Sequence, residues 1–203
     1  MVAKDSERTP ELLIKAALNC FLNDEYDKVT TRQIAAEAGV NASMIRYYFG
    51  NKEGLFEDMI RQTLSPLLDA MDNPEIDKMD GLTGFFKIYY DTMSQNPKFP
   101  VLILKIMALN HGPGKNVLKQ LFERGKSTGT NTVSTLKKEH KIDSSIDFDI
   151  LRISFVSLAM MPMLVKNIFE ENIEKEMDSE FLDKLAMFNG QLMMKGLAPS
   201  NND

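Results

Sequence analysis

The 203-residue sequence contains one cysteine, two histidines and no tryptophan. A single cysteine cannot form an intramolecular disulfide, and so few thiol and imidazole side chains exclude a structural zinc site. Basic residues are not in excess either, because 24 Lys and Arg stand against 29 Asp and Glu, for a formal net charge of −5. These counts exclude a disulfide framework, a metal centre and a protein that is basic throughout, and we expect no cofactor.

Long apolar runs are also missing. The longest uncharged apolar stretch, residues 153–165, contains Pro162 and is shorter than the roughly 20 residues that span a bilayer. The first ten residues are polar and mixed in charge, without the apolar centre of a secretory signal. We therefore expect a cytoplasmic protein with no membrane partner.

Apolar residues recur with helical spacing along the whole chain, and no alternating pattern is long enough to build a sheet. The composition, 43 % hydrophobic and 26 % charged, is typical of a globular protein. The sequence predicts an all-α fold of about nine helices, separated by Gly, Pro, Asn and Asp residues. They span about residues 10–23, 31–38, 42–49, 52–68, 82–95, 99–110, 115–139, 147–172 and 179–196.

Residues 31–49, TRQIAAEAGVNASMIRYYF, have the pattern of a helix-turn-helix. This motif needs two steeply crossed helices, a small residue where they touch and a glycine in the turn, roles that suit Ala35 and Gly39. The outward residues of the second helix are short, hydrogen-bonding or aromatic, as in helices that enter the major groove. The alternative is an ordinary helical hairpin whose aromatic residues pack in the core.

Charge supports the DNA-binding interpretation. Between residues 28 and 52 the basic residues outnumber the single acid, Glu37, and the segment carries a local charge of +3 inside an acidic protein. Such a patch is suited to phosphate contact. The basic residues are Lys28, Arg32, Arg46 and Lys52.

The segment YDKVTTRQIAAEAGVNASMIRYYFGNKEGLF resembles the N-terminal signature of the TetR/AcrR family of transcriptional regulators. The matching positions are Tyr26, Thr30, Thr31, Ile34, Ala35, Ala38, Gly39, Val40, Tyr48, Phe49, Lys52 and Glu53. The resemblance implies phosphate contacts by Thr31, Tyr48 and Lys52. It also implies a base-facing set of Arg32, Ala42, Ser43, Met44, Arg46 and Tyr47. Ser43 and Arg46 depart from the residues usual in the family, so relatives do not indicate the operator sequence.

The same resemblance implies two domains. We expect an N-terminal three-helix DNA-binding domain over residues 1–52, followed by a helical effector-binding and dimerisation domain over residues 53–203. Within the second domain, flexible Met and aromatic side chains suit a loosely shaped hydrophobic effector. The candidate pocket residues are Phe85, Phe86, Tyr89, Tyr90, Met93, Phe99, Met107, Met160, Met161 and Met163, although plain core packing explains the same pattern.

Two apolar stripes on the last long helices are candidates for a dimer interface. They consist of Phe148, Leu151, Phe155 and Leu158, and of Phe181, Leu185, Phe188 and Leu192. Either stripe could instead pack on the chain's own core. Dimerisation has a separate argument, because one recognition helix touches few base pairs and specific binding normally uses two half-sites.

The predicted function is a ligand-responsive repressor that binds a near-palindromic double-stranded DNA operator as a homodimer and is released by a small hydrophobic effector. The alternative is a DNA-binding regulator without a small-molecule effector, whose helical domain docks a protein partner. An enzyme is not expected, because the sequence offers no Ser-His-Asp set, phosphate-binding glycine loop or metal cluster.

Overall fold

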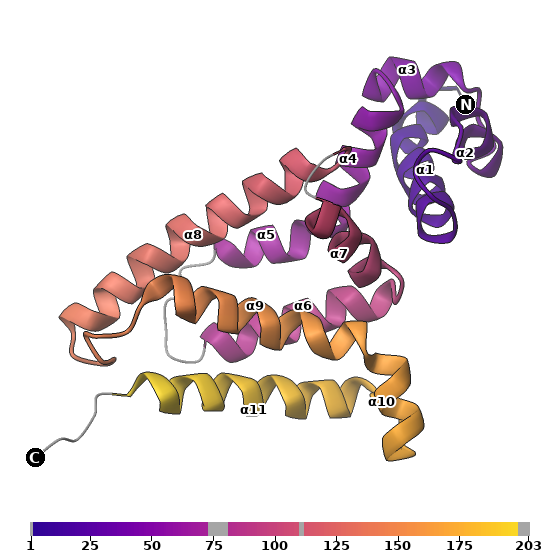
Figure 1. Cartoon of the computed structure of the whole chain (residues 1–203). Coiled ribbons are helices and arrows are strands. Elements are labelled where there is room, and N and C mark those ends of the chain that lie inside the picture. The colour runs from indigo at the N-terminus through magenta and orange to yellow at the C-terminus, as the bar shows by residue number, and fades with distance from the viewer. Residues whose placement is uncertain (1, 73–80, 110–111, 199–203) are drawn as a thin grey trace, which may run out of the picture. The chain divides into compact units, whose positions relative to one another are not determined.

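The computed structural model describes residues 2–72, 81–109 and 112–198, and side chains within 8–72, 82–108 and 112–198. Every regular element in these ranges is an α-helix, which confirms the all-α prediction (Figure 1). The helices are α1 (Val2–Asn23), α2 (Thr31–Glu37), α3 (Ser43–Phe49), α4 (Lys52–Thr63), α5 (Ser65–Met71), α6 (Gly81–Gln95), α7 (Phe99–Leu109), α8 (Lys115–Lys138), α9 (Phe148–Leu164), α10 (Lys166–Ile173) and α11 (Ser179–Leu197).

The described residues form eleven helices rather than about nine, because two predicted helices are each divided in two. The helix predicted over 52–68 ends at Thr63, and Pro66 lies in the first turn of α5, where its missing N–H costs no helical bond. The helix predicted over 147–172 breaks at Val165, and α9 and α10 are bent by 66°. Helix α1 begins at Val2, earlier than the start expected near residue 10, and runs through Pro10.

No single helix among the described residues has both the length and the apolar content needed to cross a membrane. Helices α9 and α10 pass that test only when they are taken together, across their bend.

The helices fall into two compact units, whose boundaries lie within α5, α7 and α8. Unit 1 comprises Met1–Ser65 and Val101–Lys119, and unit 2 comprises Pro66–Pro100 and Gln120–Asp203. These units are defined by packing, whereas the boundary expected at residue 52 divides the chain by function and stays a prediction.

In unit 1, α1 packs against α2, α3 and α4, and α4 also packs against α3. The buried side chains come from all four helices, so each contributes one apolar face to a common core. Leu13, Ile34, Ile45, Leu55 and Met59 are representative members of this core.

In unit 2, α6 is the central helix, and it packs against both α9 and α11 (Figure 1). Its Phe86, Tyr90 and Met93 are fully buried. Close packing of α6 and α11 requires Gly190, because a Cβ there would collide with the Thr83 side chain. The approach of these helices therefore depends on the absence of a side chain at one position.

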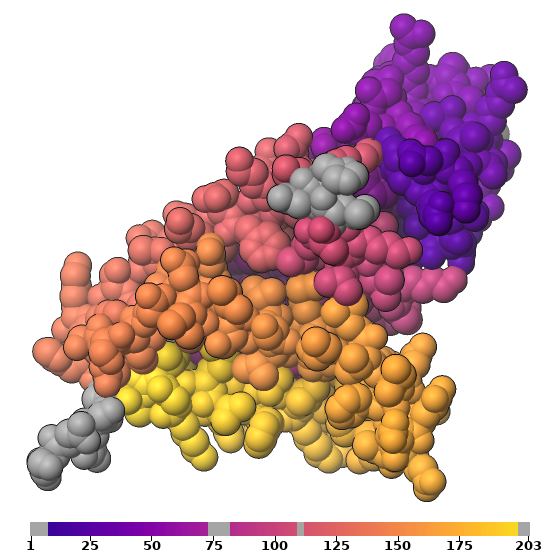
Figure 2. All heavy atoms as spheres, in the orientation of Figure 1, coloured from indigo at the N-terminus to yellow at the C-terminus, as the bar shows by residue number. Residues whose placement is uncertain are grey.

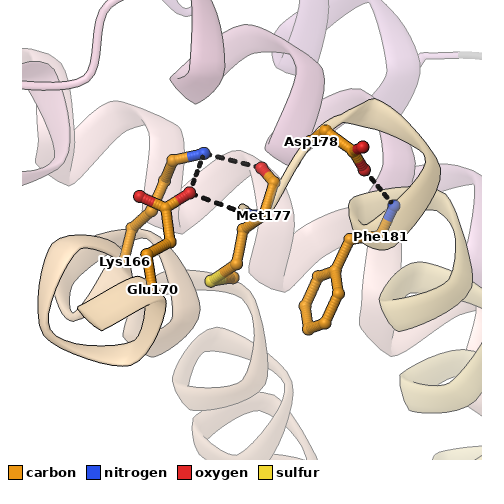
Figure 3. A network of polar contacts seen from close by, with 5 residues as sticks. All are labelled: Lys166, Glu170, Met177, Asp178 and Phe181. Carbon is orange, nitrogen blue, oxygen red and sulfur yellow. Dashed lines mark hydrogen bonds and ion pairs between the residues drawn. The ribbon is translucent and has the colours of Figure 1, made fainter. Parts of the chain in front are cut away.

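Polar contacts fix the corner between α10 and α11 (Figure 3). Lys166 Nζ donates to the Met177 carbonyl at 2.6 Å and pairs with Glu170 Oε1 at 3.1 Å. Glu170 Oε1 also accepts the Met177 N–H at 2.7 Å, while Asp178 Oδ1 caps α11 by accepting the Phe181 N–H at 2.9 Å. The segment that joins the two helices is thus held at both ends.

Candidate nucleic-acid interface

Helix α2 begins with a reciprocal cap. Thr30 Oγ1 accepts the Gln33 N–H at 3.2 Å, and the Gln33 side chain accepts the Thr30 N–H at 2.8 Å. This capping box satisfies backbone donors that have no partner inside the helix. The start of the helix-turn-helix is therefore determined by residues only three positions apart.

The turn between α2 and α3 has the predicted glycine in the left-handed region. Gly39 has φ +67°, and the Val40 N–H reaches back to the Ala35 carbonyl at 3.0 Å. A residue with a Cβ is strained at that φ, whereas glycine is not. Ala35 is buried, in keeping with its predicted place at the helix crossing.

Helix α3 presents a polar and aromatic face to solvent. Asn41 Oδ1 accepts the Ser43 N–H at 2.8 Å and sets the start of the helix, and Ile45 is buried beneath it. Tyr47 is 77 % exposed, the highest value among the large hydrophobic side chains that the structure exposes. Of the predicted base-facing residues, Arg32, Ser43, Arg46 and Tyr47 are exposed, whereas Ala42 and Met44 are half-buried.

The three predicted phosphate-contacting residues, Thr31, Tyr48 and Lys52, are all half-buried. The Tyr48 ring packs edge-on against Tyr47, with centroids 4.8 Å apart, and lies 6.3 Å from the Phe49 ring. These contacts hold the two tyrosines of α3 in a fixed relation.

Lys52 is already engaged within unit 1. Its Nζ donates to the carbonyls of Tyr26 at 2.9 Å and Val29 at 3.0 Å, and it lies 4.1 Å from the centroid of the Tyr26 ring. An ammonium group has three N–H donors, so one is left for a phosphate. Lys52 thus ties the loop between α1 and α2 to the start of α4, a role the sequence did not reveal.

Tyr26 belongs to an aromatic cluster behind this contact. Its ring stacks on Phe21 with centroids 5.5 Å apart and meets Phe56 edge-on at 5.0 Å. Burial, followed by the nearby carboxylates of Glu53, Asp27 and Glu57, raises the pKa of the Tyr26 hydroxyl. The phenol stays neutral, and its ring remains a stable partner for the Lys52 ammonium.

Two residues at the start of α4 position α3 and were not singled out from the sequence. Asn51 Oδ1 accepts the Gly54 N–H at 2.8 Å. Gly54 lies so close to α3 that a Cβ would collide with the Phe49 carbonyl oxygen. The signal that could have found them is an Asn followed three residues later by Gly at a helix start.

The basic residues of the segment differ in how much charge they offer to solvent. Lys28 forms an exposed pair with Glu25 at 3.1 Å, and such pairs contribute little energy. Arg32 and Arg46 are exposed, and neither takes part in an ion pair with another described residue. The cationic groups that α2 and α3 offer to a phosphate or a base are therefore mainly these two arginines.

Other chemistry finds little support in unit 1. Cys20 is half-buried, and burial, then Glu37 and Asp24, raise the pKa of its thiol, which disfavours a reactive thiolate. Among the described residues, no three His, Cys, Asp or Glu side chains converge as metal ligands.

The predicted effector-pocket residues are not all brought together. Six of them are buried, namely Phe86, Tyr89, Tyr90, Met93, Phe99 and Met163. Phe85 and Met160 are half-buried, and the rings of Phe85 and Phe86 contact Phe155 at 5.2 and 4.7 Å. Met161 is exposed, and Met107 belongs to unit 1 while the others belong to unit 2.

The predicted dimer stripe on α9 packs within unit 2. Phe148, Leu151, Phe155 and Leu158 are half-buried, and Phe148 packs so closely on α8 that a Cβ at Gly129 would lie 2.9 Å from its ring. Instead, α9 exposes Ile150, Ile153 and Met161, here called the α9 strip. On α11, Phe181 and Leu185 are half-buried, whereas Met187, Phe188 and Leu192, the α11 strip, are exposed.

Comparison with known proteins identifies the helix-turn-helix region. Residues 13–59 match the sequence profile described as "Bacterial regulatory proteins, tetR family". The HTH-type transcriptional regulator BetI 2 of Chromohalobacter salexigens is 42 % identical over 59 residues, a match that covers 29 % of this chain and 28 % of that relative. The HTH-type transcriptional repressor NicS of Pseudomonas putida is 25 % identical over 144 residues, or 63 % of this chain and 68 % of that protein.

The whole chain has the fold of a solved regulator. The transcriptional regulator FadR from Bacillus subtilis, solved in complex with stearoyl-CoA, superposes with a TM-score of 0.72 over 92 % of this chain and 98 % of that chain, at 14 % identity. The profile match coincides with α1 to α4, the helices that form and support the helix-turn-helix. The N-terminal region of the chain, residues 13–59, therefore belongs to the TetR family of bacterial regulatory proteins.

Proposed function

We propose that this protein is a cytoplasmic, ligand-responsive transcriptional repressor that binds a near-palindromic DNA operator as a homodimer. Helix α3 would lie in the major groove, and a small hydrophobic effector bound in unit 2 would release the DNA. The observation that carries the proposal is the face of α3, where Ser43, Arg46 and Tyr47 are exposed while Ile45 anchors the helix. Such a face supplies hydrogen-bonding groups and an aromatic ring that can contact base edges.

The phosphate contacts would come from residues around that face. Thr31 begins α2 and Tyr48 lies on α3, Lys52 has one N–H donor left, and Arg32 extends the cationic surface from α2. Phosphate contacts set the register of a protein on DNA, and base contacts then give specificity. The half-buried Ala42 and Met44 would contribute short apolar contacts, for example to a thymine methyl group.

A homodimer is supported by the apolar strips on α9 and α11. Ile150 and Ile153 are 68 % and 67 % exposed, and Phe188 is 62 % exposed. The surfaces of α9 and α11 adjoin on the face of unit 2 shown in Figure 2. Exposed apolar side chains gathered on neighbouring helices are a usual site of association, and a four-helix interface with a second copy would cover them.

An effector site in unit 2 is supported by the incomplete burial of apolar side chains on α8 and α9. No side chain of α8 from Leu121 to Lys138, nor of α9 from Phe148 to Leu158, is fully buried, although both segments carry large apolar residues. Incompletely covered apolar side chains on facing helices are suited to an apolar ligand. A long-chain acyl-CoA is the first candidate to test, because FadR has the same fold and was solved with stearoyl-CoA.

The link between ligand and DNA would run through α4, which packs against α1 and α3 in unit 1 and leads into α5 after Leu64. Effector and operator would then weaken each other's binding by the same factor. Small shifts in packed helices are a common means of such coupling.

The test begins with selection of bound fragments from random duplex DNA by the purified protein. We expect a near-palindrome with two half-sites, and we expect the Arg46→Ala, Tyr47→Ala double variant to recover no enriched sequence. An enriched site with a single half would contradict the homodimer, and no enrichment would contradict the DNA-binding role.

Operator affinity is then measured with and without stearoyl-CoA and with the free fatty acid. A fall in affinity with either compound supports the effector site. An unchanged affinity with these and other apolar compounds favours the alternative, in which unit 2 docks a protein partner.

A further inference from the structure

Helix α9 contains a proline at a position where its effect on the backbone can be traced. Pro162 has no N–H, so the carbonyl of Leu158, four residues earlier, lacks its usual partner in the helix. The Tyr90 hydroxyl supplies one from α6, because its Oη lies 2.9 Å from that carbonyl oxygen. A carbonyl only accepts hydrogen bonds, and therefore the single hydroxyl proton of Tyr90 points to Leu158.

A third helix meets the same hydroxyl. Asn189 Nδ2, on α11, lies 2.9 Å from Tyr90 Oη. Because the hydroxyl proton is already directed to Leu158, the oxygen must accept here, which also determines the orientation of the Asn189 amide. One phenol oxygen thus joins α6, α9 and α11. We call Tyr90, the Leu158 carbonyl and Asn189 together the Tyr90 joint.

The joint is enclosed. Tyr90 is 0 % exposed and Asn189 4 % exposed, and burial raises the pKa of the Tyr90 hydroxyl to about 12. The hydroxyl therefore stays protonated at neutral pH and keeps donating to Leu158. A buried polar group that loses its partner is costly, so the three helices are held together at this point.

The joint lies next to both apolar strips in the sequence. Leu158 precedes Met161 of the α9 strip by one helical turn, and Asn189 follows Phe188 of the α11 strip directly. Asn189 is buried and Phe188 is exposed, so these two consecutive residues of α11 point to the core and to solvent, respectively. Both helices pack on α6, and the hydroxyl of one α6 residue therefore fixes both.

We propose that Tyr90 is a positioning residue, whose hydroxyl holds α9 and α11 on α6 and so keeps the α9 and α11 strips aligned for a second copy of the chain. This inference rests on the proposed homodimer. Pro162 contributes to the Tyr90 joint, because its missing N–H leaves the Leu158 carbonyl able to accept a hydrogen bond from Tyr90 on α6.

The experiment is a double-mutant cycle on the full chain, with Tyr90→Phe, Pro162→Ala and the two combined. Tyr90→Phe removes only the hydroxyl, and we expect the Tm to fall by about 3 to 6 °C. We also expect self-association, measured by sedimentation equilibrium, to weaken by about fivefold to tenfold. Pro162→Ala restores an N–H for Leu158, so in the Tyr90→Phe background it should recover about half of the lost Tm.

Tyr89→Phe is the matched control, because Tyr89 is also buried but its hydroxyl bonds no described residue, and neither readout should change.

A Tyr90→Phe variant with the parent's Tm, or one that Pro162→Ala does not rescue, overturns the joint. Phe188→Glu separates the remaining outcomes, because it disrupts the α11 strip without touching the joint. If Phe188→Glu dissociates the protein while Tyr90→Phe does not weaken association, the positioning role is overturned and the homodimer stands. If the parent itself is monomeric, both the homodimer and the positioning role fail, whatever the Tm cycle shows.

Discussion

The helix-turn-helix of unit 1 and the centre of unit 2 depend on polar contacts of different range along the sequence. In unit 1, the side-chain caps of the helix-turn-helix join residues two or three positions apart, as in Thr30 with Gln33, Asn41 with Ser43 and Asn51 with Gly54. In unit 2, the Tyr90 hydroxyl joins residues 68 and 99 positions away. Local caps depend on contiguous residue types, and this is why unit 1 is recognisable from its sequence while unit 2 is not.

The comparison also separates the two units by how completely they cover their apolar side chains. Helices α1 to α4 each bury an apolar face in a shared core, whereas large parts of α8 and α9 leave apolar residues half-covered. A rigid unit suits a surface that must match DNA, and a less filled unit suits a ligand or a second copy. The following predictions test this difference, from the largest expected effect to the smallest.

Gly54→Ala should destabilise unit 1 by about 3 kcal/mol, because the new Cβ collides with a backbone atom that cannot move aside cheaply. Thermal unfolding measures the effect. The matched control is Gly84→Ala on α6, where a Cβ meets nothing within 4 Å and alanine favours the helix by up to about 1 kcal/mol. Equal stability of the two variants would contradict the idea that unit 1 has no room at the start of α4.

Arg46→Ala should cost about 1 to 3 kcal/mol of discrimination at particular base pairs of the operator, because a side chain that reads a base edge is lost. Competition binding with single-base operator variants measures this. Arg61→Ala serves as the control, since Arg61 lies exposed on α4 and pairs with Asp58. A uniform loss across all operator variants would assign Arg46 to a phosphate instead.

Lys52→Ala should weaken operator binding about tenfold on every sequence and lower the salt slope by about one, if its third N–H contacts a phosphate. The variant also frees the carbonyls of Tyr26 and Val29, so its Tm should fall as well. Lys28→Ala removes the same charge from an exposed pair and should leave the Tm unchanged. A loss of Tm and affinity with an unchanged salt slope would leave Lys52 with the structural role alone.

Glu170→Gln should slightly change the pH dependence of the stability of the folded chain in the acid range. The Met177 N–H, then Lys166, lower the pKa of Glu170 in the folded chain. Its stabilisation is therefore present above the unfolded pKa of about 4.3 and is lost as the pH falls through the lower folded pKa. Acid unfolding followed by circular dichroism should show a shallower pH dependence in Glu170→Gln. Glu171→Gln, at an exposed neighbouring position, is the control, and its acid unfolding should match that of the parent.

Much of the fold was predictable from local pattern. The predicted ends of the helices near residues 23, 49 and 95 agree with the structure, because Gly, Asn and Pro end helices by their own backbone preferences. The break at Val165 was not predicted, because the apolar spacing continues through it, whereas Pro66 indicated that the helix predicted over 52–68 would bend or shorten. Spacing alone does not reveal a break when both sides of it carry apolar residues.

The orientation of the side chains on α3 was also predictable from the sequence, whereas the contacts of Lys52 were not. Arg46 and Tyr47 are exposed on α3 and Ile45 is buried, as the helical period requires. Lys52 could not be assigned to its carbonyl partners, because these lie in a loop 23 and 26 residues earlier. The contact of Phe155 with Phe86 on α6 could not be assigned, because α9 has apolar residues on more than one face and the sequence does not say which one α6 covers.

The sequence by itself determined the helical class, the helix-turn-helix and the residues that cap it, because these depend on hydrogen bonds between groups a few positions apart. Only the tertiary structure decided which face of α9 turns outward, where the Lys52 ammonium binds and which group satisfies the carbonyl that Pro162 leaves open. Those outcomes depend on which distant segments pack together within each unit, and no contiguous segment determines this by itself.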